Sequence, residues 1–241
     1  MYEEGITEIT VKVARMAELK ILRILNNVSQ VSTLAAPNIR VVDVTRSKDH
    51  EKHLYGCLAA FTKIRRYRKR SEYLAEATGK GLRKHVLFMD EEAVGMIEYA
   101  PPDASPYPID GEGVVVMSCV WVLRRAEGRG FGKMLLEGML EDARDVAGFA
   151  SIALVGHPSP WLRLSHMERL GFTSIDSRRM RHKVKKPEQC FEVHLMWMPI
   201  SEGAPEPEMR WPEMLKGMDY CIGHPLYRAE SHGLVEPLEF C

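Results

Sequence analysis

The chain has 241 residues, a length that suits one large domain or one domain with appendages. Apolar residues make up 45% and charged residues 27% of it, as in ordinary globular proteins. Its 33 basic residues balance 33 acidic ones, so the overall charge gives no reason to expect nucleic acid or an anionic membrane as a general partner.

The start of the chain and its cysteines indicate a cytoplasmic location. The first residues lack the basic start and apolar core of a signal peptide, and no apolar run approaches the length of about 18 residues that a membrane span needs. The cysteines are odd in number and widely spread, at Cys57, Cys119, Cys190, Cys221 and Cys241. We therefore expect reduced thiols, not a disulfide framework, and no membrane partner.

Residues 1–36 precede the first expected strand of the domain and form an N-terminal extension. Apolar and polar residues alternate in its early part, and residues 14–26 have the spacing of an amphipathic helix. We expect this extension to pack against the domain or against a second subunit, which would make a homodimer.

The domain itself is expected to begin with a strand over residues 38–45 and a helix after it. The segment 63–70 holds six basic residues in eight. Such a run is usually a solvated helix face; the alternatives are contacts with an acidic partner, RNA or the phosphates of coenzyme A. Because Tyr67 is the only aromatic residue in the run, it does not resemble a base-stacking surface, and nucleic acid is not an expected partner.

A hairpin is predicted over residues 84–100, with an acidic turn at residues 90–92. Residues 101–110 are rich in proline, which cannot donate to a strand ladder, and are expected to be a loop. This loop leads into the central strand and is well placed to line a substrate site.

Residues 114–140 contain the most informative pattern. A β-branched, apolar run over 114–123 predicts a buried strand, and a helix with one apolar face follows from residue 131 onward. Between them stand Gly128, Gly130 and Gly132. A glycine loop at a helix N-terminus offers unpaired backbone N–H groups and a partial positive charge, so it suits a phosphate. The spacing matches neither the dinucleotide fingerprint nor the P-loop.

Four further elements complete the domain in the order strand 151–155, short helix 161–170, strand 172–175 and strand 191–198. The basic run 178–186 is expected to be an exposed loop.

The tail from residue 201 begins with a Pro/Glu-rich linker and then becomes too apolar for a disordered segment. We expect residues 201–241 to form a C-terminal extension that docks on the core or on a partner subunit and shapes an acceptor site. Cys221 and His224 resemble half of a zinc site, but His232 and Cys241 lack the paired spacing of a second half, so no metal is expected.

Two segments together resemble the GNAT acyltransferase superfamily. Residues 127–132, Glu-Gly-Arg-Gly-Phe-Gly, resemble its acetyl-CoA loop, with Glu127 where the family has Arg or Gln. Residues 165–172 resemble its Tyr-Glu-Lys-Leu-Gly-Phe helix end. Within the superfamily, Pro108-Ile-Asp110 and Cys119-Val-Trp121-Val are similar to a YoaP-like subgroup.

This resemblance implies an α/β fold over residues 37–200: a mixed, mostly antiparallel sheet, splayed where acetyl-CoA enters, with helices on both faces. It implies an acetyl-CoA-dependent N-acetyltransferase that acts on a small-molecule or peptide amine, with Ser159 and Trp161 as further coenzyme A contacts. The cosubstrate would be held by Val120, Trp121, Val122, Gly128, Arg129, Gly130, Phe131, Gly132 and Lys133.

The catalytic groups are harder to assign because Met167 occupies the family's usual Tyr position and cannot donate a proton. Glu98, His157 and His166 are the candidates for proton transfer. The methionine also favours an alternative, a non-catalytic acyl-CoA-binding sensor or interaction module. A third hypothesis is an RNA- or ribosome-associated protein that uses the basic run.

Overall fold

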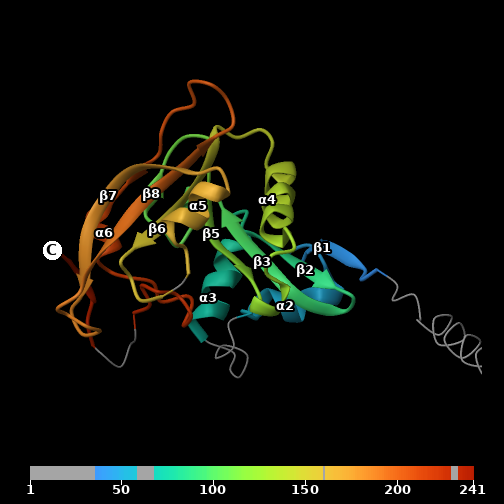
Figure 1. Ribbon diagram of the computed structural model, residues 1–241, viewed down its shortest axis with the longest axis horizontal. Helices are drawn as coiled ribbons and strands as arrows, with labels where there is room; N and C mark the ends of the chain where they lie inside the picture. Colours follow the sequence, from blue (N-terminus) through green and yellow to red (C-terminus); the bar gives the residue numbers. More distant parts are fainter. Residues whose placement is uncertain (1–35, 59–67, 160, 229–232) are drawn as a thin grey trace, which may run out of the picture. The chain divides into compact units, whose positions relative to one another are not determined.

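The computed structural model describes residues 36–58, 68–159, 161–228 and 233–241 (Figure 1). The chain divides into two units, Met1–Pro37 and Asn38–Cys241, and everything below concerns the second. Nearly all of the predicted N-terminal extension, and most of the basic run 63–70, therefore lie outside the described residues.

An eight-stranded mixed sheet organises the second unit, in the order β1-β2-β3-β5-β6-β8-β7-β10. Its strands are β1 (Ile39–Asp43), β2 (Arg83–Met89), β3 (Glu92–Ala100), β5 (Val114–Val122), β6 (Gly148–Val155), β7 (Thr173–His182), β8 (Cys190–Pro199) and β10 (Leu238–Phe240). Every pairing is antiparallel except that of β5 with β6. The predicted strands and the hairpin are confirmed.

The parallel pair β5 and β6 is joined over one end only. Its ladder runs from Val114 opposite Gly148 to Val116 opposite Ala150, although β5 continues to Val122. Gly148 is required at this junction, since a Cβ there would lie 2.4 Å from the ring of Trp197. Beyond the ladder the β6-facing edge of β5 has no strand partner among the described residues, so the sheet is open at this point.

Helices cover both faces of the sheet. Gly95 on β3 faces Leu135 of α4 (Phe131–Asp142), whereas Glu98 on the same strand contacts Arg70 of α3 (Arg68–Ala77). Side chains an odd number of positions apart on a strand point to opposite faces, so α4 and α3 cover opposite faces (Figure 1). The remaining short helices are η1 (Lys48–His50), α2 (Glu51–Tyr55), η3 (Pro102–Ala104), η4 (Arg124–Ala126), α5 (Leu164–Arg169) and α6 (Trp211–Met214).

The C-terminal tail packs into the same hydrophobic core. β10 pairs with the edge strand β7, and β9 (Glu208–Met209) pairs with β4 (Ile109–Asp110) inside the segment predicted to be a loop. Apolar tail residues that lie in the core are Met209, Trp211, Met214, Met218, Tyr220, Leu226 and Leu238.

One loop prediction was wrong: the basic run 178–186 belongs in its first half to β7, where Met180 is fully buried. The charged side chains misled the prediction because they lie on the exposed positions of a strand that the tail covers at its edge. No helix in the described ranges is long and apolar enough to cross a bilayer.

The prediction that all cysteines are free thiols was also wrong, because Cys190 and Cys241 form a disulfide. They are separated by 51 residues, and only the pairing of β7 with both β8 and β10 brings them close. Cys57, Cys119 and Cys221 are not in a disulfide.

We expect this disulfide to stabilise the fold substantially. Closing a loop of 51 residues limits the unfolded chain by about 4 kcal/mol in the loop-entropy model. Cys241→Ser should therefore lower the free energy of unfolding by about 2–4 kcal/mol, measured by urea denaturation. Reducing agent should lower the stability of the wild type and leave that of the variant unchanged; equal stability of the two proteins under oxidising conditions would contradict the prediction.

Candidate functional site

The loop between β5 and α4 is built for close approach of a ligand. Gly128 and Gly130 have φ angles of 76° and 77°, a region that favours glycine, and Gly130 is the N-cap of α4. A Cβ at Gly128, Gly130 or Gly132 would meet nothing within 4 Å. No side chain caps this helix N-terminus, so its first N–H groups remain available as donors.

These glycines line a cleft of about 580 Å³ at the opening between β5 and β6. The end of β5 forms one wall, the glycine loop and the start of α4 form the second, and residues 161–170, which include α5, form the third. Its lining residues include Val120, Trp121, Val122, Glu127, Gly128, Gly130, Phe131, Gly132, Lys133, Trp161, Leu162, His166 and Met167.

Eight of the nine residues predicted to hold acetyl-CoA line the cleft. The ninth is Arg129, whose guanidinium lies 3.3 Å from the sulfur of Met89. Of the two further predicted contacts, Trp161 lines the cleft and Ser159 does not. Trp121 adds a feature that the sequence did not reveal: its indole Nε1 is buried and has no hydrogen-bond partner among the described residues. A buried donor without a partner is costly.

Glu98 lies away from the cleft, on the face of the sheet that α3 covers. It is 1% exposed and forms ion pairs with Arg70 and with Lys84, whose Nζ is 3.2 Å from Oε1. Burial alone would raise the pKa of this carboxyl, but the charges of Arg70 and Lys84 outweigh it and hold the pKa below its ordinary value. A carboxylate held in this way is a poor proton acceptor near neutral pH.

His157 also lies outside the cleft lining, just after the end of β6. Its Nδ1 accepts from the backbone N–H of Ser159, so its Nε2 carries the proton and donates to Nε2 of His182 over 3.1 Å. Both rings pack against Phe191. Burial, together with the charge of Lys185, lowers the pKa of His157 to about 4. Burial, His157 and Lys185 lower that of His182 to about 4.

This pair predicts a loss of stability in mild acid. Between about pH 6.5 and pH 4 these two histidines are protonated in the unfolded chain, where their pKa values are near 6.5, but stay neutral in the folded protein. The contribution is therefore complete above about pH 6.5 and is lost as the pH falls toward about 4. His182→Phe, which keeps a ring beside Phe191, should show a shallower fall in unfolding free energy over this range. Parallel pH profiles of variant and wild type would contradict the prediction.

His166 is the predicted catalytic residue that does line the cleft. It is exposed on α5, and partial burial with the charges of Arg169 and Arg163 lowers its pKa. Met167 beside it is 1% exposed and also lines the cleft. His166 and Glu168 are both adjacent in sequence to the position where the family carries tyrosine, and of these two only His166 lines the cleft.

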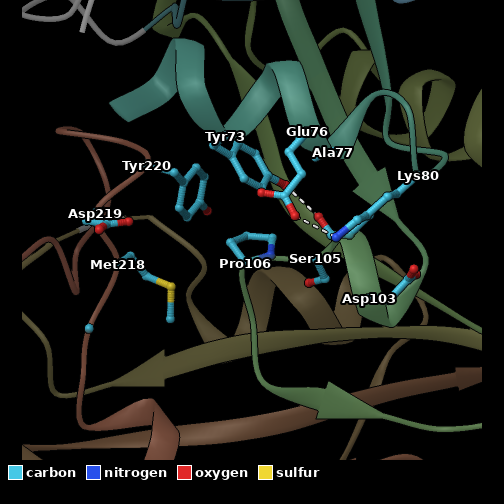
Figure 2. A pocket seen from close by; sticks show the side chains of 12 residues that line it. Tyr73, Glu76, Ala77, Lys80, Asp103, Ser105, Pro106, Met218, Asp219 and Tyr220 are labelled. Atoms are coloured by element: carbon cyan, nitrogen blue, oxygen red, sulfur yellow. Dashed lines mark hydrogen bonds and ion pairs between the residues drawn. The ribbon is translucent and has the colours of Figure 1, made fainter. Parts of the chain in front are cut away.

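A second cavity of about 230 Å³ lies between α3, the loop 103–106 and the tail turn 217–220 (Figure 2). Two of the three carboxylates that line it are in ion pairs, Glu76 with Lys80 and Asp219 with Lys69 and Arg228, and the third is that of Asp103. Tyr73 and Tyr220 stand on one side of it, with ring centroids 5.0 Å apart (Figure 2). The sequence did not predict this cavity, because its walls come from three distant segments.

The sequence suggested only one role for the tail residue His224, that of a metal ligand. Nδ1 accepts from the backbone N–H of Leu226, and Nε2 lies 3.0 Å from the hydroxyl of Tyr107, so neither nitrogen is free for a metal. Cys241 is in the disulfide. Within the described ranges, no three His, Cys, Asp or Glu side chains are grouped so that they could hold a metal ion.

Comparison with known families identifies this class of protein. Residues 51–172, about half of the chain, match the Acetyltransferase (GNAT) family, and the chain belongs to that family. The predicted family and the predicted splayed, mixed sheet are both confirmed. Acetyl-CoA, the predicted cosubstrate, is the one normally used in this family.

A curated relative agrees with the predicted YoaP-like subgroup. It is a Bacillus subtilis (strain 168) protein named uncharacterized N-acetyltransferase YoaP, 27% identical over 139 residues, which are 56% of this chain and 54% of the relative. The chain thus spans about half the length of the curated relative that it matches.

Solved structures with similar folds include a GNAT family acetyltransferase from Elizabethkingia anophelis with acetyl-CoA bound. It is 15% identical, with 68% of this chain and 99% of that chain covered and a TM-score of 0.46. The ribosomal-protein-S18-alanine N-acetyltransferase from Escherichia coli is 15% identical, with 69% and 96% covered and a TM-score of 0.47.

Proposed function

We propose that this chain is an acetyl-CoA-dependent N-acetyltransferase that acts on an amine of a small molecule or peptide. One observation carries the proposal: the open glycine loop at the N-terminus of α4 lines a cleft whose other walls are the end of β5 and residues 161–170. The domain limits 37–200, the extensions 1–36 and 201–241, a homodimer and a cytoplasmic location remain parts of the same proposal.

The residues of the cleft fit the cosubstrate. Backbone N–H groups from Gly128 to Lys133 would donate to its pyrophosphate, helped by the positive end of α4. Main-chain groups of Val120 and Val122, on the edge of β5 that has no strand partner among the described residues, would hold the pantetheine arm and the acetyl carbonyl. When bound, acetyl-CoA supplies an activated acetyl group.

The chain itself must then move protons. An acceptor amine attacks only in its neutral form, and the departing thiolate needs a proton or a stabilising dipole. Glu98 and His157 do not line the cleft, which leaves His166 as the predicted residue suited to this task. We propose that the neutral imidazole of His166 accepts the proton that the attacking amine loses and then delivers it to the thiolate that leaves as the amide bond forms.

His166→Gln should therefore lower kcat by about ten- to a hundredfold, while the affinity for acetyl-CoA stays within a few-fold. Adding Met167→Tyr to that variant should restore part of the rate, because the phenol would stand at the family's usual position. Single-turnover kinetics measure both effects. An unchanged rate in the glutamine variant would show that His166 carries no proton in the reaction.

The alternative, a non-catalytic acyl-CoA-binding sensor, is favoured by one observation: the buried Met167 in the cleft. The two functions are separated by incubation with acetyl-CoA and a panel of amino acids, polyamines and peptides, with release of free thiol as the readout. Acceptor-dependent thiol release supports the transferase. Tight binding of acetyl-CoA without release by any acceptor would favour the sensor.

A further inference from the structure

The C-terminal tail reaches the cleft through a buried histidine, His224. This residue is 3% exposed, and its ring centroid lies 4.6 Å from that of Trp161 at an interplanar angle of 85°. Trp161 in turn lines the cleft. A tail residue therefore packs directly behind a side chain of the proposed cosubstrate site.

Hydrogen bonds fix the orientation and tautomer of His224. The hydroxyl of Tyr107 donates to the carbonyl oxygen of Ser118 over 2.8 Å, so its oxygen accepts from Nε2–H of His224 over 3.0 Å. Nδ1 of His224 accepts from the backbone N–H of Leu226 over 3.0 Å. With both ring nitrogens engaged, the ring cannot rotate without losing a buried hydrogen bond. Burial also keeps the pKa of His224 well below its ordinary value, in agreement with a neutral ring.

Trp161 bridges the two strands where they no longer pair. It follows β6 in the chain, and its indole Nε1–H donates to the carbonyl oxygen of Val120 on β5 over 3.3 Å. The next residue, Leu162, has a φ of 50°, which is strained for a leucine and persists only where the surroundings fix it. Its carbonyl accepts from the N–H of Leu154 over 2.8 Å, so this turn is held on both sides.

We propose that His224 is a positioning residue of the acetyltransfer site. It holds Trp161 against Val120. The tail thereby fixes the position of the Trp161 side chain in the cleft, next to the main chain of Val120, which is proposed to hold the acyl end of acetyl-CoA. The inference rests on the proposed function, and it makes part of the C-terminal tail a working component of the cleft.

The test uses the full chain with His224→Leu and the more conservative His224→Gln, which keeps a donor for Tyr107. The first readout is the indole N–H signal of Trp161 in ¹⁵N NMR spectra of the free protein, assigned among the four tryptophans with Trp161→Phe. The second is the affinity for acetyl-CoA by calorimetry, and the third is the split between kcat and KM. Met214→Ala is the matched control, because Met214 is a fully buried tail residue outside the cleft lining.

We expect His224→Leu to shift the Trp161 signal, to speed its hydrogen exchange and to weaken acetyl-CoA binding by about tenfold, as loss of one positioned interaction does. His224→Gln should show smaller changes in the same direction, and it carries the test if the leucine variant does not fold. Met214→Ala should lower stability but keep the Trp161 signal and the affinity.

Unchanged Trp161 signal and affinity in the folded His224 variants would overturn the proposal, and so would equal changes in Met214→Ala. Failure of the proposed function is a separate outcome, because it would appear as absent acetyl-CoA binding in the wild type. The Trp161 signal of the free protein would then still decide whether His224 positions this side chain.

Discussion

Replacing Gly130 with valine is expected to lower the affinity for acetyl-CoA by at least about a hundredfold. Gly130 has a φ of 77° and open space beside it, so backbone N–H groups can face a pyrophosphate without a side chain in the way. A β-branched residue would strain the turn and fill that space. Calorimetric titration of the folded variant with acetyl-CoA measures the loss.

Two matched controls separate ligand exclusion from damage to the fold. Gly203 has a φ of 75° and open surroundings too, so Gly203→Val introduces the same strain outside the cleft lining and should bind normally. Within α4, Gly132→Ala and Gly138→Ala should both add helix propensity, yet only the first places a methyl group in the cleft. Normal binding by both Gly130→Val and Gly132→Ala would show that the pyrophosphate lies elsewhere.

Glu98→Ala should destabilise the fold by about 3–5 kcal/mol, because it leaves two buried cations without their shared counter-charge. Arg70 is 6% exposed and Lys84 1%, and the other acceptors of Lys84 among the described residues are the backbone carbonyls of Leu54 and Gly56. Urea denaturation at neutral pH measures the loss.

The ion pair between Glu76 and Lys80 provides the comparison, since both side chains are exposed and Glu76→Ala should change stability little. This prediction also separates two roles for Glu98. A Glu98→Gln variant that is folded and stable and binds acetyl-CoA, but has lost turnover, would contradict a purely structural role. Glu98 would then again be a candidate for proton transfer.

The sequence by itself determined the family, the chain order of the central strands and the position of the glycine loop before α4. These features are local: apolar runs with period 2 or 3.6, and glycines at fixed spacing between a strand and a helix. Eight of the nine predicted cosubstrate residues line the cleft because they follow one another at the end of β5 and the start of α4.

The tertiary structure decided everything that depends on contacts between distant segments. Glu98 looked like a base, but its partners Arg70 and Lys84 lie 28 and 14 positions away and turn it into a buried ion pair. Likewise, β10 and β8 meet through β7, which alone explains the disulfide between Cys190 and Cys241. His224 stands 63 positions beyond Trp161 in the chain, and yet their rings touch. A residue's chemistry depends on the charges, donors and solvent around it, and long-range packing sets these.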